Sequence, residues 1–156
     1  MKKLLVVALL ISFNSNFSQN QQDIYNIIDA VSAERIQNDV QTLVDFGTRN
    51  TFSDTISETR GIGAARRWIK KEFETISSTC DNCLDVFYQK DLVTKEGNSR
   101  VPKDAWVVNV VAIQKGTKHP NRYVIMSGDI DSRASDTMDF TTDAPGANDN
   151  ASGMAG

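Results

Sequence analysis

The sequence predicts an α/β domain. Two observations support this fold class: apolar residues recur at helical spacing in the first half of the chain, and they alternate or run continuously in the second half. A chain of 156 residues forms one domain by length and can bury a sizeable core. The net charge is -3 and no block of basic residues occurs, so nucleic acid is not an expected partner.

The first residues, MKKLLVVALLISFNSNFSQ, have the pattern of a signal peptide. Lys2 and Lys3 precede an apolar run from Leu4 to Phe13, and a short polar stretch follows. The run is too short to cross a bilayer, which needs about 20 residues, and no cysteine follows it that could carry a lipid. We therefore assign residues 1–19 to a signal peptide and residues 20–156 to the mature domain. We expect a secreted or periplasmic protein without a membrane anchor; a buried N-terminal helix or strand is the alternative.

Helical spacing of apolar residues continues from Gln22 to Phe46, with a break expected near Ser32. In the stretch SAERI, Ser32 can cap a second helix, and Glu34 would lie in its first turn. A polar, turn-rich loop follows, and a further helix is expected over residues 60–76. One face of that helix is apolar. The charged residues of its other face are predicted to be exposed to solvent: Arg66, Arg67, Lys70, Lys71 and Glu72.

Three later segments predict strands. The segment LDVFYQKDLV alternates between apolar and polar residues, and AWVVNVVAIQKG is rich in β-branched residues. The continuous apolar run YVIMSG is typical of a central strand buried on both faces. The small residues of NASGMAG then indicate the start of a helix. Because a domain rarely ends where a helix begins, and a central strand needs neighbours on both sides, we expect an N-terminal portion of a longer protein.

The two cysteines, Cys80 and Cys83, lie in the motif CDNC. In an oxidising compartment the simplest interpretation is a disulfide that closes a short loop. Free thiols and redox catalysis are the alternatives. A structural zinc site would need four Cys or His ligands, whereas the chain has two Cys and one His. That histidine, His119, is expected to be exposed in the turn TKHPNR.

Acidic residues gather in the stretch SGDIDSRASDTMDFTTDAPGANDN. Asp129 and Asp131 follow the predicted buried strand at its carboxyl end, where the functional groups of open α/β sheets gather. Residues two apart in a strand point to the same side, so both carboxylates can face one site. A cation there would offset the cost of burying them. Asp149 follows the turn residues APG, which can return the loop toward the strand. The other acids of this loop are predicted to be solvated: Asp136, Asp139 and Asp143.

Two common binding loops do not fit this stretch. Counted from Asp129, an EF-hand calcium loop would need glycine at Ala134 and glutamate at Phe140. The segment GANDNASG lacks the Gly-Lys-Ser/Thr ending of a phosphate-binding loop.

Five segments, in order, carry a resemblance to a known family: FGTRNT, SETRGIGAARRWI, VVNVVAIQKG, YVIMSGDIDSR and APGANDNASG. Over residues 31–156 the chain resembles the N-terminal part of secreted zinc aminopeptidases of the bacterial leucyl aminopeptidase and aminopeptidase Y type. The resemblance implies a three-layer zinc-exopeptidase fold with a central mixed sheet, of which the chain holds the N-terminal helices and first strands. It also implies two divalent metal ions, expected to be zinc, that activate water to release N-terminal residues from peptide substrates.

The resemblance implies roles for three of the acids. In the family, a His-x-Asp motif supplies a zinc ligand and a catalytic Asp that orients it, and Asp131 matches that Asp. Asp149 matches the ligand that bridges both metals, and the bond from Asp149 to Asn150 matches one that is often cis. Asp129 stands where the family has His. A carboxylate can bind zinc, but its hardness shifts the expected preference toward Mg, Mn or Ca. A modified two-metal site is expected; one weakened or lost metal position is the alternative.

The family's general base and remaining ligands follow the bridging Asp, beyond Gly156. The resemblance therefore implies that the 156-residue chain alone is inactive. Two other functions fit the same residues. One is a glutaminyl-peptide cyclotransferase of the same fold, and the other is a non-catalytic binding domain that has lost its metal. The side-chain preference and the oligomeric state do not follow from the sequence.

Overall fold

The structure is a computed structural model that describes residues 19–97, 99–136 and 138–156. The predicted signal peptide, residues 1–19, lies outside the described residues except for Gln19. The chain divides into two units, residues 1–35 and 36–156. Across the described ranges, no helix has both the length and the apolar character needed to span a membrane.

The first described helix, α2 (Gln19–Asp29), belongs to the first unit. The apolar side chains of Ile24, Ile27 and Ile28 are exposed on it. The chain then leaves the helical conformation before α3 (Ala33–Asp45). The Ser32 hydroxyl accepts a hydrogen bond from the Arg35 backbone N–H at 3.1 Å, so the predicted break and cap are confirmed.

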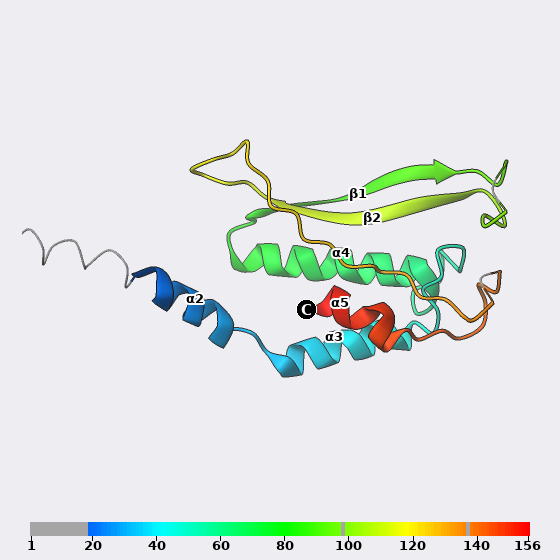
Figure 1. The fold of residues 1–156 in the computed structure, drawn as a ribbon, viewed down its shortest axis with the longest axis horizontal. Coiled ribbons are helices and arrows are strands. Elements are labelled where there is room, and N and C mark those ends of the chain that lie inside the picture. Colours follow the sequence, from blue (N-terminus) through cyan, green and yellow to red (C-terminus); the bar gives the residue numbers. More distant parts are fainter. Residues whose placement is uncertain (1–18, 98, 137) are drawn as a thin grey trace, which may run out of the picture. The chain divides into compact units, whose positions relative to one another are not determined.

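The second unit combines α3 with the long helix α4 (Gly61–Thr79) and a β-hairpin. Strands β1 (Leu84–Val93) and β2 (Ala105–Gln114) pair antiparallel. Figure 1 shows the hairpin running along α4, with a last helical segment on the helix's other side. That segment consists of η2 (Ala147–Ala151) and α5 (Ser152–Ala155).

The core of the second unit lies where α3, α4 and the last helical segment meet. Rings of Phe46 and Trp68 contact each other with centroids 6.4 Å apart. Small residues on α4 allow close packing: a Cβ on Gly63 would lie 2.3 Å from the Thr55 carbonyl oxygen, so the helix start rests directly on the preceding loop. The buried apolar residues of this core are Leu43, Phe46, Ala64, Ala65, Ile69 and Ala151.

The segment 123–128, expected to be a buried central strand, forms no strand in the structure. The side chains of Val124, Ile125 and Met126 are 93%, 87% and 89% exposed. A groove of about 590 Å³ separates the segment from β2. A central strand needs a paired neighbour at each edge, and no other described segment pairs with this one. The sheet of the described residues therefore has two strands, both from the hairpin.

A second expectation is wrong for one residue of α4. Arg66 was expected on the solvent-exposed face of that helix, yet only 7% of its surface is exposed. Two segments lie over this part of α4: the loop that precedes the helix, and the hairpin. Thr55 of the loop and Val108 of the hairpin line one cavity together with Arg66. The charged pattern of the helix gives no sign of this covering, which comes from segments distant in sequence.

Candidate functional site

Arg49 ties together the segments that carry the predicted site residues. Its side chain is fully buried just after α3. Its Nε donates a hydrogen bond to the Ile130 carbonyl at 2.9 Å, and Nη2 donates to the Gly146 carbonyl at 3.1 Å. Its Nη1 donates to the carbonyls of Leu43 and Pro145 at 2.6 and 2.7 Å. We call these contacts the Arg49 network.

Carbonyl oxygens solvate the charge of Arg49, and no carboxylate among the described residues forms a direct ion pair with it. Burial lowers the pKa of the Arg49 guanidinium, and the nearby charge of Asp131 acts against this shift. Arginine nevertheless keeps its proton in proteins. Four carbonyl dipoles thus solvate a buried cation, and Asp131 lies within its field. This places one predicted site residue beside a fixed positive charge.

Ser132 connects the segment that carries Asp129 and Asp131 to the loop that leads to Asp149. Its hydroxyl accepts a hydrogen bond from the Arg49 backbone N–H at 2.9 Å and donates one to the Ala144 carbonyl at 2.5 Å. Ala144 in turn forms a parallel bridge with Thr48. Since Ser132 is buried, these bonds are shielded from water and fix the chain just after Asp131.

Gly146 shapes the loop that carries Asp149. It adopts a left-handed conformation, and a Cβ there would lie 2.7 Å from the Ser132 Cβ, so only glycine fits. Its carbonyl also accepts a hydrogen bond from the Ala151 N–H at 3.0 Å. The backbone of Asp149 is non-helical within η2, and its peptide bond to Asn150 is cis, as the resemblance implied.

Residues 128–132 form no strand, but exposed and covered residues alternate along them. Asp129 and Asp131 are exposed, whereas Ile130 between them packs against the core. The two acidic segments also meet through their backbones, because a Cβ on Gly128 would lie 2.8 Å from the Gly153 carbonyl oxygen. The segment bearing Asp129 therefore lies directly against the start of α5.

The three carboxylates are the type of ligand that a divalent cation accepts, but they do not form a group large enough to hold one. Asp129, Asp131 and Asp149 are exposed and supply the oxygen ligands that zinc or a harder ion accepts. No hydrogen bond or ion pair occupies these three groups within the described ranges. However, the described residues contain no group of three or more His, Cys, Asp or Glu side chains that could hold a metal ion.

Two other acids of this loop have partners of their own: Asp139 within the loop, and Asp143 at Arg60, next to the start of α4. Asp143 pairs with Arg60 at 2.6 Å, and the Asp143 side chain is largely exposed whereas that of Arg60 is partly covered. Asp139 accepts hydrogen bonds from the Thr141 and Thr142 N–H groups at 2.9 and 3.0 Å. Hydrogen bonds from Thr142, and then from Thr141, hold the pKa of Asp139 well below its ordinary value. Asp139 therefore stabilises its own loop, whereas Asp143 connects that loop to the start of α4.

The cysteines and the histidine lie elsewhere. Cys80 and Cys83 form a disulfide between the end of α4 and the start of β1. His119 is exposed in the turn after β2. The sequence did not single out Arg49 or Ser132, although both organise the candidate site. Most of their contacts are with residues more than 80 positions away. The exceptions are the bond from Arg49 to Leu43 and the bond from Ser132 to Ala144.

Comparisons with known proteins bear on the same region. Residues 109–156 match the model of Peptidase family M28. A "probable zinc metalloprotease" of Leptosphaeria maculans is 41% identical over 135 residues, which are 86% of this chain and 31% of that protein. One of Pyrenophora teres f. teres is 42% identical over 129 residues, or 83% of this chain and 26% of that protein. The chain thus spans less than a third of these curated relatives. No solved structure matches it.

Proposed function

We propose that this chain is the N-terminal part of a zinc-dependent peptidase of family M28, and that the whole protein acts as an aminopeptidase. One observation carries the proposal: the region that matches the family contains all three candidate acids, on two segments that the Arg49 network holds together. The relatives named as zinc metalloproteases support zinc as the metal. The aminopeptidase activity and a pair of metals rest on the resemblance of the sequence motifs to the leucyl aminopeptidase and aminopeptidase Y type.

Each acid has a proposed role in the complete site. Asp149 and Asp129 would hold metal, and Asp131 would orient the groups around it. The metal would supply a water molecule of lowered pKa and polarise the scissile carbonyl. The chain's own contribution is positional: Ser132 and Arg49 fix the backbone on both sides of Asp131, and Gly146 sets the turn that leads to Asp149. Further ligands and the general base would come from outside these 156 residues.

The activity is tested on the full-length protein with two matched peptides, one with a free N-terminus and one acetylated there. An aminopeptidase releases the first residue of the free peptide and leaves the acetylated peptide intact. A chelator should abolish this release, and added zinc should restore it. Cleavage of the acetylated peptide at an internal bond would show an endopeptidase instead. No cleavage of either peptide by the zinc-loaded protein would contradict the proposal.

A matched pair of variants assigns the activity to this site. Asp149→Asn removes a proposed metal ligand while keeping the size of the side chain, so peptide release should fall by at least a hundredfold, a loss of about 3 kcal/mol in transition-state stabilisation. Asp136→Asn makes the same change in the loop, where Asp136 is exposed and its carboxylate accepts a hydrogen bond from the Met138 N–H. That variant should keep the native rate.

A binding domain without metal is the second candidate. It is favoured by Asp129, which stands at a position where the resembling enzymes have histidine. The two candidates differ in metal content. A full-length protein that stays free of metal when zinc is supplied would be the binding domain.

The proposed location is outside the cell or in the periplasm, on the strength of the N-terminal signal-peptide pattern. Mass spectrometry of the exported protein should find an N-terminus near residue 20. Retention of Met1 in a cytosolic product would contradict it.

A further inference from the structure

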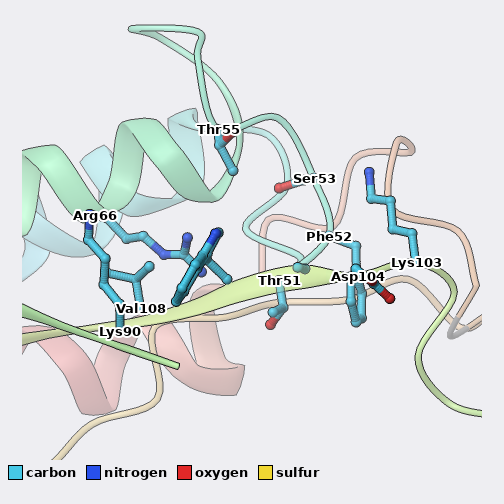
Figure 2. A pocket seen from close by; sticks show the side chains of 11 residues that line it. Thr51, Phe52, Ser53, Thr55, Arg66, Lys90, Lys103, Asp104 and Val108 are labelled. Carbon is cyan, nitrogen blue, oxygen red and sulfur yellow. The ribbon is translucent and has the colours of Figure 1, made fainter. Parts of the chain in front are cut away.

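A cavity away from the acidic segments lies between the start of α4, the hairpin and the loop of residues 51–55. Its volume is about 580 Å³, within the range of about 300–1,000 Å³ that small organic ligands occupy. Figure 2 shows Arg66 extending from α4 into this space, with Lys90 beside it and Lys103 near the other end. None of the acids proposed to hold metal lines this cavity.

Arg66 is the unusual residue of this cavity. It is 93% buried, since only 7% of its surface is exposed, and its Nε is fully buried without a hydrogen-bond partner. Burial also lowers the pKa of the Arg66 guanidinium, with Tyr88 acting in the opposite direction. Native proteins pair nearly all buried polar groups, so an unpaired one requires an explanation. A buried charge is retained where something neutralises it.

The lining carries an excess of positive charge. Arg66, Lys90 and Lys103 are cationic, and Asp104 is the single acid among the lining residues, all of which the structure describes. The two lysines contact aromatic rings rather than carboxylates: Lys90 Nζ lies 5.7 Å from the Tyr88 ring centroid, and Lys103 Nζ lies 4.6 Å from that of Phe140. The cavity is therefore electrostatically suited to an anion.

Aromatic groups give the cavity a second feature. Phe52 and Trp106 contribute to its lining, and Trp106 is 57% exposed although it lies on β2. A large aromatic side chain that is only partly covered can pack against a flat apolar group of a ligand. A guanidinium forms paired hydrogen bonds with carboxylate and phosphate groups.

We propose that this cavity binds a small organic anion whose carboxylate or phosphate group pairs with Arg66 and whose planar apolar part packs against Trp106. This site is independent of the proposed peptidase function. The ligand would neutralise the charge of Arg66, whose Nε has no partner, and cover the exposed indole at once. The two acid groups share the chemistry that Arg66 recognises, so separate probes distinguish them.

The proposal is tested by calorimetric titration of the full-length protein. Four probes are titrated: benzoate, phenyl phosphate, inorganic phosphate and neutral benzamide. We expect at least one of the two aromatic anions to bind, and to bind at least tenfold more tightly than benzamide. Phenyl phosphate should also bind more tightly than inorganic phosphate if the indole contributes. Failure of both aromatic anions to bind, or equal binding of benzamide, would overturn the site. Equal binding of inorganic and phenyl phosphate would overturn the role of Trp106.

Two variants connect binding to the named residues. Arg66→Met keeps the aliphatic stem but removes the charge. It should lower the affinity for the anion roughly tenfold or more, as the loss of a charged hydrogen bond predicts. Lys71→Met removes a charge from an exposed position on the same helix and should leave binding unchanged. Native affinity in Arg66→Met would contradict the assignment.

A stability measurement separates lost binding from lost folding. The Arg66 Nε makes no hydrogen bond that the variant could lose. The urea midpoint of Arg66→Met, without ligand, should therefore equal or exceed the native midpoint. If this variant unfolds instead, Trp106→Ala provides the test from an exposed position: it should weaken phenyl phosphate binding and leave inorganic phosphate unaffected. Unchanged binding of phenyl phosphate would then refute the proposal.

Discussion

Replacing Arg49 tests whether one side chain holds the candidate site together. The substitution Arg49→Met keeps an unbranched side chain in a position that is fully buried, but it removes every donor of the Arg49 network. The Gly146 carbonyl keeps a second hydrogen bond from the Ala151 N–H. The carbonyls of Leu43, Ile130 and Pro145 lose the donor that the structure shows for them.

The size of the effect follows from those three carbonyls. A buried acceptor left without a partner costs about 1–3 kcal/mol. Two of the three bonds are only partly buried, so we take the lower value for each. The free energy of unfolding should therefore fall by about 3 kcal/mol. A typical domain has about 5–15 kcal/mol in total, so this loss is large but leaves room for a folded variant.

Urea unfolding followed by circular dichroism measures this loss. Arg49→Lys serves as a graded variant, because it retains the charge but lacks the fork that reaches several carbonyls, and its loss should be intermediate. Lys71→Met, at an exposed position of α4, should change the free energy of unfolding by less than about 0.5 kcal/mol. A loss below about 1 kcal/mol for Arg49→Met would show that the network does not hold these segments.

Two further substitutions test the packing of α4 and the acidic loop. Gly63→Ala should destabilise the protein by about 1–3 kcal/mol, because the new Cβ would meet the Thr55 carbonyl oxygen. Gly116→Ala, whose new Cβ would have its nearest contact at 3.6 Å, should be tolerated. Equal urea midpoints for the two variants would contradict this. Asp139→Asn should cost stability mainly above the unfolded-state carboxyl pKa of about 3.9. The folded-state pKa of Asp139 is lowered, so its contribution disappears as the pH falls toward that folded value. Urea midpoints from about pH 6 to pH 2.5 would show the variant approaching the native protein, and a constant difference would refute the assignment.

The sequence predicted the elements that local patterns determine. The cap at Ser32 and the strand from Leu84 to Val93 depend on neighbouring residues, and the structure agrees with both. Helix and strand periodicities act over a few residues, so one chain segment suffices to read them.

The features that the sequence did not reveal depend on distant segments. An arginine in the polar stretch GTRNT gives no local sign that its guanidinium will bond Ile130 and Pro145, more than 80 residues later. Arg66 has the helical position of a solvent-exposed charge, and only the hairpin and loop that cover it make it buried. The apolar run 123–128 has the composition of a buried strand, but strand formation needs pairing partners that no composition supplies.

The metal content of the full-length protein tests the central claim most directly. Protein prepared with zinc supplied in excess and then freed of unbound metal should contain at least one zinc ion per chain, measured by mass spectrometry of the elements. Asp149→Asn should lose most of that zinc, while Asp136→Asn, in the neighbouring loop, should keep it. Zinc-free native protein, or native zinc content in Asp149→Asn, would contradict a metallopeptidase site built on Asp149.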